Sequence, residues 1–241
     1  MMLALETSGT RASVALAWED GRVREAAAGG ALCHARDVLV LADGLLREEG
    51  RAPGDLGSVA AGLGPGSYTG MRVGAATAKL LAWALGVPLV GVGSLAVLAE
   101  NAPPEHEVVV SAIAAKRGCL FCGVYRRRDG RLAGQERPRF VEIAEAVETI
   151  PSGAAVLGSG TPMLVEATKG KGIVALGEEL WEPRAAALAQ IALEKLRAGE
   201  TTSPPALAPL YLRRSEAEEL WEKRHGDVGG GGGLSDRPKR L

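Results

Sequence analysis

Residues 3–28 read LALETSGTRASVALAWEDGRVREAAA, in which short apolar runs are separated by turn residues. The first run ends at Ser8-Gly9-Thr10, and the second leads to Asp20-Gly21. An Asp-Gly pair between two such runs is a strong signal for a type I′ hairpin turn. The chain is therefore predicted to begin with a meander of three strands.

The same pattern returns in the second half of the chain. Gly118 precedes Asp129-Gly130 by the same spacing that separates Gly9 from Asp20-Gly21. Two matched meanders on one chain indicate an internal duplication. The strands of the second meander are expected at residues 107–115, 119–128 and 131–140.

The remaining segments show helix and strand patterns in alternation. Gly86 is placed to end one helix, and Pro88 follows shortly after it. In chain order we expect a helix at 34–48, a short buried strand before the glycine-rich stretch 62–70, a helix at 71–86, a strand at 88–93, a helix at 94–101, a helix at 142–149, strands at 154–160 and 172–176, and a helix at 183–198.

Residues 101–104 (NAPP) break this alternation and are the best candidate for a domain boundary. We expect one subdomain at 1–102 and a second at 103–225, and allow for the last segment of the second packing back on the first. Residues 226–241 are rich in glycine and carry too few apolar side chains to fold, so they are predicted to form a disordered tail.

Composition limits the classes of function. The 241 residues carry a formal net charge of −1, whereas nucleic-acid binding driven by counterion release needs a basic face, so any tRNA contact should depend on a partner. No apolar stretch approaches the roughly 18 residues of a membrane-spanning helix. The three cysteines cannot all pair with one another. A cytoplasmic protein with reduced thiols and no membrane partner is expected.

Three stretches carry a resemblance to a known family: 3–16 (LALETSGTRASVAL), 62–79 (GLGPGSYTGMRVGAATAK) and 208–215 (APLYLRRS). They resemble the TsaB (YeaZ) family, and the middle stretch is the most specific. The resemblance implies an α/β protein with a duplicated actin-like ATPase (ribonuclease H-like) fold of two βββαβα-type subdomains. It also implies a non-catalytic scaffold in the transfer of threonylcarbamoyl to the adenosine next to the anticodon of tRNAs that read codons starting with A.

The same resemblance implies partners. Members pair with the transferase TsaD, and the ATPase TsaE joins them. Alone, the chain is expected to form a homodimer, and tRNA is expected to be reached only through the complex. No cofactor is expected on this chain by itself, although ATP or ADP is possible in the complex.

A vestigial nucleotide site is expected at Glu6, Ser8 and Gly9. Working members of the actin-like superfamily hold magnesium through carboxylates near the first strand of each half, because this ion prefers oxygen ligands. Glu6 has such a place in the first half, but residues 113–116 (IAAK) carry no carboxylate in the second. Turnover by this chain alone is therefore not expected. Glu6 is equally compatible with an ordinary carboxylate at a strand end.

No metal site is expected. TsaD-like members bind a metal through two histidines one helical turn apart and an aspartate. Here His34 stands at the start of the comparable helix, but the residue one turn later is Val38. A lone imidazole is a weak ligand set, so His34 is interpreted as a polar residue at a helix start.

The stretch that contains Gly64 and Gly66 is interpreted as a structural turn that starts a helix. It lacks the Gly-Lys-Ser/Thr of a phosphate loop and the flanking glycines of a nucleophile elbow. The glycines permit a sharp turn and a Ser or Thr caps the helix. The turn residues are Gly64, Gly66, Ser67, Thr69 and Arg72.

Small residues recur along the helix that follows this turn. Either they pack on the chain's own sheet, or they let a partner helix approach closely. Since both sides of the helix carry apolar residues, we favour an intermolecular bundle made with helix 34–48. The predicted partner interface comprises His34, Val38, Leu41, Leu45, Gly70, Met71, Gly74, Ala75, Ala78 and Ala82.

Two alternative functions remain open. One is an ATP-dependent enzyme of the actin and sugar-kinase class, or a glycoprotease-like hydrolase; the missing acids weigh against it. The other is a redox protein that uses Cys119 and Cys122. Positions three apart in a strand point to opposite faces, so buried thiols are favoured over a reactive pair.

Overall fold

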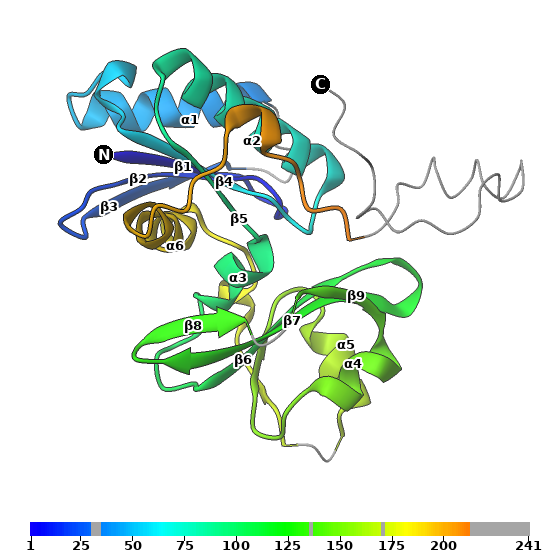
Figure 1. The fold of residues 1–241 in the computed structure, drawn as a ribbon. Coiled ribbons are helices and arrows are strands. Elements are labelled where there is room, and N and C mark those ends of the chain that lie inside the picture. The colour runs from blue at the N-terminus through cyan, green and yellow to red at the C-terminus, as the bar shows by residue number, and fades with distance from the viewer. Residues whose placement is uncertain (30–34, 135–136, 170–171, 213–241) are drawn as a thin grey trace, which may run out of the picture. The chain divides into compact units, whose positions relative to one another are not determined.

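The first three strands form the predicted meander and continue into a five-stranded sheet in the order β3-β2-β1-β4-β5 (Figure 1). The computed structural model describes residues 1–29, 35–134, 137–169 and 172–212. β1 pairs antiparallel with β2 and parallel with β4. The strands are β1 (Met2–Glu6), β2 (Ser13–Ala17), β3 (Val23–Ala27), β4 (Ser58–Gly62) and β5 (Leu89–Val92).

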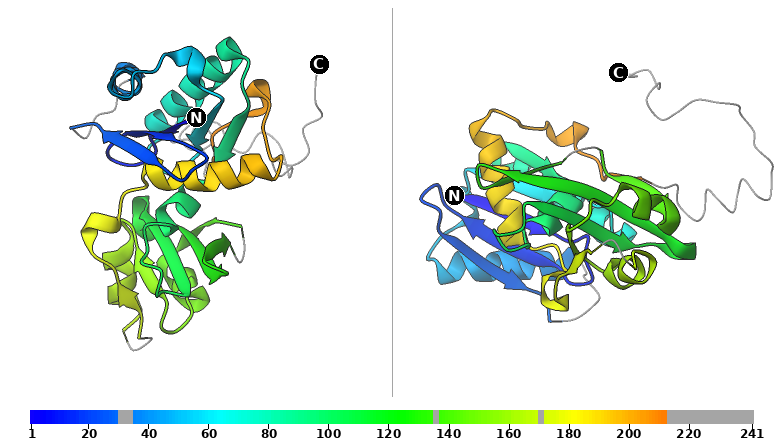
Figure 2. Two further views of the ribbon diagram at one scale, coloured as in Figure 1. Left: turned by 90° about the vertical axis from the view of Figure 1, so that its left-hand side faces the viewer. Right: turned by 90° about the horizontal axis from the view of Figure 1, so that it is seen from below.

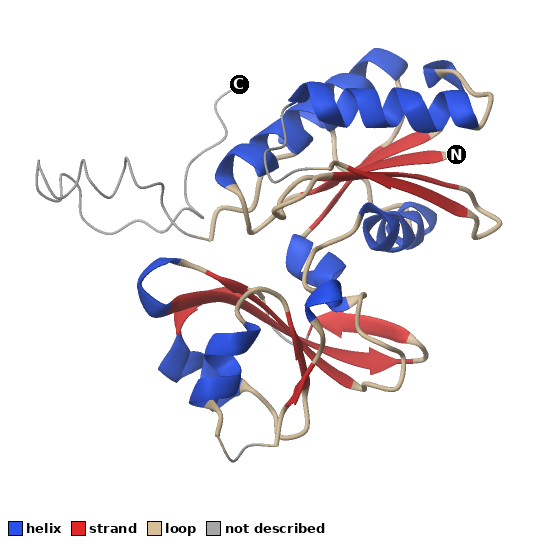
Figure 3. Ribbon diagram, turned by 180° about the vertical axis from the view of Figure 1, so that it is seen from behind, coloured by secondary structure: helices blue, strands red, loops and turns tan. Residues whose placement is uncertain are grey.

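Helices cover both faces of this sheet (Figure 3). Successive side chains of a strand point to opposite faces. Leu3 and Leu5 accordingly share a core with α1 (Ala35–Glu48) and α2 (Tyr68–Leu85), whereas Met2 and Ala4 share another with α6 (Ala185–Arg197). The sheet is therefore the middle layer of three.

The second meander forms a sheet in the order β11-β10-β6-β7-β8, with β9 also paired to β7. Residues 131–140 were predicted as one strand, but the structure contains two short ones, which pair with different parts of the ten-residue β7. Pro138 lacks the N–H that a ladder requires and lies just before the second of them. The strands are β6 (Val108–Ala114), β7 (Cys119–Arg128), β8 (Arg131–Gly134), β9 (Arg139–Glu142), β10 (Ala155–Leu157) and β11 (Val174–Ala175).

The second sheet is also covered on both faces. α4 (Ile143–Thr149) and α5 (Thr161–Ala167) pack against one face through Ala146 and Leu164. α3 (Ser94–Ala99) packs against the other through Leu95 and Leu98. The sequence analysis assigned no element to α5, a helix of seven residues with a proline in its first turn. Single 3₁₀ turns complete the described elements at Pro53–Asp55, Lys116–Gly118, Glu178–Leu180 and Pro204–Ala206.

Each half reads strand-strand-strand-helix-strand-helix-strand-helix, apart from the split third strand of the second half. This repeat makes the chain a duplicated actin-like fold. The last helix of each half packs on the sheet of the other half: α3 on the second sheet and α6 on the first. Figure 2 shows α6 running along the first sheet. The exchange ties the two halves together.

The chain passes from the first sheet to the second between β5 and β6, and the segment after α6 returns to the first sheet. Beyond α6, the backbone N–H of Thr202 donates to the carbonyl of Leu89 at 2.8 Å, and that of Leu210 to the carbonyl of Leu63 at 2.8 Å. Leu207 is buried in the core of the first sheet. Met1–Leu210 form one compact unit. The predicted tail lies outside the described residues.

None of the helices in the described part of the chain combines the length and apolarity needed to cross a membrane.

Candidate functional site

Glu6 ends β1 and is completely buried. Its Oε1 accepts a hydrogen bond from the backbone N–H of Ser8 at 2.8 Å, and its Oε2 accepts one from the hydroxyl of Ser94 at 3.0 Å. A Cβ added to Gly62 would lie 2.1 Å from Oε2, so backbone closes over the carboxyl group. Burial raises the pKa of Glu6, and the hydrogen bonds from Ser8 and Ser94 lower it only in part. The carboxylate is enclosed rather than presented to a ligand.

The same network fixes the turn before α2. The hydroxyl oxygen of Ser94 accepts from the N–H of Gly64 at 3.0 Å, and the N–H of Ser67 donates to the carbonyl of Ser8 at 2.7 Å. A Cβ on Gly66 would lie 2.2 Å from that same Ser8 carbonyl oxygen, so only glycine fits there. The peptide bond between Gly64 and Pro65 is cis. These contacts fix the backbone geometry that starts α2.

Ser67 is the residue that caps α2, since its Oγ accepts from the N–H of Gly70 at 3.2 Å. Thr69, the other predicted cap, is exposed. Arg72 stacks on the ring of Tyr68, with 4.0 Å between its guanidinium carbon and the ring centroid. Gly86 ends the helix in the left-handed conformation, as the sequence predicted.

The β1–β2 turn binds the carboxylate of Glu182, a residue that precedes α6 in the second half of the chain. Glu182 accepts hydrogen bonds from the backbone N–H of Thr10 at 2.9 Å and from its hydroxyl at 2.7 Å. A Cβ on Gly9 would lie 2.3 Å from Glu182 Oε2, so a side chain there would displace the carboxylate. Asn101 Nδ2 donates to the carbonyl oxygen of Glu182 at 2.6 Å and steadies this segment. The carboxylate of Glu182 therefore occupies both hydrogen-bond donors of Thr10.

The sequence contains no signal for the Glu182 contact. Thr10 and Glu182 are separated by 172 positions in the chain. A single glutamate before a helix does not match any sequence motif. Only the return of the chain toward α6 brings Glu182 to the turn.

In the second half, the place that corresponds to Glu6 carries no acid. β6 ends at Ala114, whose N–H donates to the hydroxyl of Ser159 at 3.0 Å. Throughout the described ranges, no three His, Cys, Asp or Glu side chains lie close enough to hold a metal ion. His34 lies outside the described residues, and Val38 is fully buried in the apolar core.

The small-residue face of α2 packs on the chain's own strand, which corrects the expectation that it faces a partner. A Cβ on Gly70 would lie 1.9 Å from the carbonyl oxygen of Thr7, and one on Gly74 would lie 2.2 Å from Thr7 Oγ1. The hydroxyl of Thr7 donates to the carbonyl of Gly70 at 2.7 Å. Glycines here let the helix approach its own sheet. The buried members of this face are Gly70, Met71, Gly74, Ala75, Ala78 and Ala82.

The predicted interface residues of α1 also face inward. Val38 and Leu45 are buried in the core of the first sheet, and Leu41 is half-buried against it. Other apolar side chains of α1 and α2 do reach solvent. On α1 they follow directly after Val38, and on α2 they lie on the side that faces away from the sheet. This outer helix surface consists of Leu39, Val40, Tyr68, Leu80 and Trp83.

The outer helix surface is unusual in its exposure: Trp83 is 76% and Leu80 65% accessible. Single exposed apolar residues are common, whereas these five lie on two helices that contact each other, which makes the outer helix surface a candidate interaction site. Both helices lie on the same side of the first sheet (Figure 1). The described residues of α1 and α2 that the sequence assigned to a partner are buried or half-buried, whereas other apolar residues of the same two helices are exposed.

Cys122 carries a free thiol and is buried in β7. Burial raises the pKa of Cys122 to about 11, so its thiol is protonated at neutral pH. This environment does not favour a reactive thiol.

Comparisons with known proteins agree with this architecture. A family model described as TsaD, tRNA N6-adenosine threonylcarbamoyltransferase, matches residues 29–221. The tRNA threonylcarbamoyladenosine biosynthesis protein TsaB of Bacillus subtilis is 31% identical over 91% of this chain and 97% of its own length. The protein of the same name in Escherichia coli is 30% identical over 93% of this chain and 98% of its own length.

A solved structure of YeaZ from Pseudomonas aeruginosa superposes with a TM-score of 0.78 at 29% identity, covering 87% of this chain and 99% of that one. Similarity therefore extends over nearly the whole length of these relatives, in sequence and in structure. The chain belongs to the TsaB (YeaZ) family of tRNA threonylcarbamoyladenosine biosynthesis proteins.

Proposed function

We propose that this chain is a non-catalytic scaffold of tRNA threonylcarbamoyladenosine synthesis, which pairs with the transferase TsaD through its outer helix surface. The supporting relatives are named for this pathway. The observation that supports pairing with TsaD is the exposure of the apolar residues in the outer helix surface. The product is the modified adenosine next to the anticodon of tRNAs that read codons starting with A.

A non-catalytic role is supported by the residues found where other members of the superfamily bind phosphate and metal. Glu6 is enclosed, and the backbone N–H and hydroxyl of Thr10 in the β1–β2 turn both donate to Glu182. Magnesium needs oxygen ligands that can reach it, and a nucleotide phosphate needs free N–H and O–H donors. Val38 stands in the apolar core where a second metal-binding histidine would be required. We therefore assign no cofactor to this chain alone and place any ATP or ADP in the complex.

The composition of the outer helix surface supports a protein partner. Trp and Tyr are enriched among residues that dominate binding energy, and buried apolar area contributes roughly 25 cal/mol per Å². The TsaD family model matches most of this chain, so TsaD would offer a comparable pair of helices. Two such pairs can meet around a pseudo-twofold axis. Without TsaD, a second copy of this chain takes the same place as a homodimer.

Other members of the assembly follow from this placement. The formal charge of −1 supports recruitment of tRNA through the complex rather than by this chain alone. TsaE, the ATPase, joins the pair. The site of action is the cytoplasm, where the tRNA substrate is found.

The test is a pair of surface variants, Leu80→Asp and Trp83→Ala, mixed with TsaD. Each removes an exposed apolar contact and leaves the inward face of α2 unchanged, so the fold should persist. Loss of a central contact costs about 2 kcal/mol or more, which corresponds to roughly thirtyfold weaker binding. Calorimetric titration measures TsaD affinity, and light scattering measures the homodimer.

Val165→Asp is the matched control, because Val165 is an exposed apolar residue of α5 in the second half. It should leave both associations unchanged. Retention of full TsaD affinity by Leu80→Asp and Trp83→Ala would refute the assigned surface. Steady hydrolysis of ATP by the isolated chain with magnesium would refute the non-catalytic role.

A further inference from the structure

The positive charge of this chain is concentrated around strands β7 to β9. Residues 116–139 carry eight Lys or Arg residues and two Asp or Glu residues, whereas the rest of the chain carries 20 and 27. A local basic surface is the electrostatic footprint of proteins that bind nucleic acid. The formal charge of −1 therefore conceals one basic region in an otherwise acidic chain.

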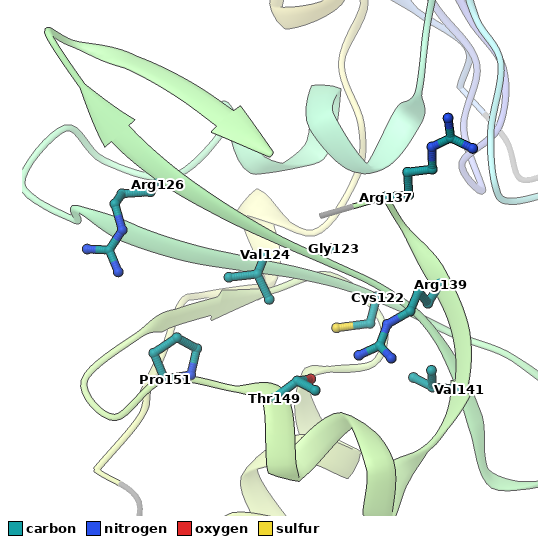
Figure 4. Close-up of a pocket in the computed structure, with 9 residues that line it drawn as sticks. All are labelled: Cys122, Gly123, Val124, Arg126, Arg137, Arg139, Val141, Thr149 and Pro151. Atoms are coloured by element: carbon teal, nitrogen blue, oxygen red, sulfur yellow. The ribbon is translucent and has the colours of Figure 1, made fainter. Parts of the chain in front are cut away.

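The register of the β7–β8 hairpin brings three arginines to one face of the second sheet. Arg128 is directly opposite Arg131 in the antiparallel ladder, which places their Cβ atoms roughly 5 Å apart. Arg126 lies two residues before Arg128 on the same strand, about 7 Å along it, and side chains two apart point to the same side. Figure 4 shows Arg126 on the same side of β7 as Val124. We name Arg126, Arg128 and Arg131 the basic hairpin face.

Arg127 belongs to the opposite face and has a structural role. Its guanidinium group donates to the carbonyl oxygens of Ala102 at 3.2 Å and Gly130 at 3.1 Å. Its side chain is only 12% exposed, and Tyr125 on the same face is buried in the core that includes α3. The run of arginines at 126–128 is therefore divided between a buried side and an accessible side of the strand.

The basic hairpin face is open to solvent. Arg128 and Arg131 are exposed, and Arg126 is half-buried. α4 and α5 cover this side of the sheet farther back along β7, where they share a core with Leu120 and Cys122. Figure 1 shows these two helices at the other end of the sheet from β8. A large ligand can therefore reach the three arginines.

The chain itself offsets little of this positive charge. Like charges directly opposite one another in a sheet are destabilising, and Arg128 and Arg131 are such a pair. Among the described residues, no carboxylate lies within ion-pair distance of Arg126 or Arg128. Arg131 Nε is 3.1 Å from Glu194 Oε1, but these side chains are 71% and 43% exposed, so solvent screens the pair. An arrangement that costs stability and is not neutralised within the chain points to an external polyanion.

We propose that the basic hairpin face contacts the phosphate backbone of tRNA in the complex. Guanidinium groups present paired N–H donors that match phosphate oxygens. The neighbouring residues on this face, Val124 and Ala133, have no ring on which a base could stack, so phosphate contacts are expected rather than base readout. Three such contacts bind weakly by themselves, which agrees with a need for TsaD. The identity of the nucleic acid rests on the proposed function.

The experiment measures binding of a labelled, unmodified transcript of a tRNA that reads codons starting with A. Fluorescence polarisation follows binding at several salt concentrations, in one arm with the purified chain alone and in another with TsaD added. A phosphate contact whose contribution scales with salt to the power of about −0.9 is worth about fivefold in affinity at 0.15 M salt. Arg128→Gln should therefore weaken binding about fivefold and reduce the salt slope by about one. Arg126→Gln combined with Arg128→Gln should weaken it about thirtyfold and reduce the slope by about two.

Arg51→Gln is the matched control, because Arg51 is an exposed arginine of the first half and its substitution removes the same charge. It should leave the affinity and the slope nearly unchanged. Arg126→Lys combined with Arg128→Lys keeps both charges and should keep the slope. Thermal unfolding of Arg128→Gln should occur at the same or a higher temperature, since the like-charge pair with Arg131 is relieved.

Calorimetric titration with TsaD separates this inference from the proposed pairing. The arginine variants should retain full TsaD affinity, whereas Leu80→Asp tests the pairing alone. If TsaD does not bind, the arm with the purified chain at low salt still tests the tRNA contact. The inference is overturned if the double Gln variant and Arg51→Gln bind tRNA equally well in both arms. It is also overturned if the double variant loses TsaD affinity while tRNA binding is unchanged, because the face would then contact a protein.

Discussion

At the scale of single residues, Glu6 links the stability of the fold to pH. Its pKa is raised by burial above the ordinary value of 4.5, so the folded protein holds this proton over a pH range in which the unfolded chain has lost it. The contribution of Glu6 to the free energy of unfolding therefore falls as pH rises from about 4.5 through the raised pKa, by at most about 1.4 kcal/mol per pH unit.

Glu6→Gln removes this titration. The amide oxygen can still accept from the N–H of Ser8, and the amide nitrogen can donate to Ser94 Oγ. We expect the stability of the variant relative to the parent protein to improve as pH rises from about 5 to 8, as measured by urea unfolding at several pH values. A stability difference that does not vary with pH would contradict the enclosed position of this carboxyl group.

At the scale of elements, the segment that leads into α6 is held to the first sheet by a few polar contacts. Glu182 accepts two hydrogen bonds from Thr10, and Arg184 is paired with Glu25 beside it. Since these groups are partly exposed, each contact contributes modestly. These polar contacts determine where α6 begins. The stability of its packing comes mainly from its buried apolar face.

Glu182→Ala should therefore lower the free energy of unfolding by about 1 kcal/mol and loosen the β1–β2 turn. Glu178→Ala, an exposed acid in the same segment, provides the control and should be neutral. Urea unfolding measures the stability, and hydrogen exchange at the N–H of Thr10 measures the opening of the turn. Unchanged exchange at Thr10 would contradict the proposed occupation of its donors by Glu182.

At the scale of the whole molecule, the exchange of last helices makes the two halves dependent on one another. A fragment of residues 1–102 contains all five strands of the first sheet but lacks α6, so one apolar face would be exposed to water. We expect this fragment to unfold without a cooperative transition, whereas residues 1–210 should unfold cooperatively. Circular dichroism on heating compares the two, and a sharp transition in fragment 1–102 would show that its sheet is stable alone.

The sequence by itself determined the meanders, the duplication and the turn before α2. These features depend on local chemistry: Asp129 and Gly130 both adopt positive φ at the hairpin, and Gly66 leaves room for the Ser8 carbonyl. It also indicated which helices carry the outer surface, because apolar residues on more than one side are visible in the pattern alone.

Only the tertiary structure decided which side of each helix is buried and where distant residues meet. Small residues such as Gly70 and Gly74 favour close approach to any neighbour, and the neighbour proved to be Thr7 of the same chain. Likewise, Glu182 reaches Thr10 through the return of the chain toward α6, and Arg139 comes to lie opposite Cys122 through strand pairing. Contacts between residues far apart in the chain depend on packing that local sequence patterns do not encode.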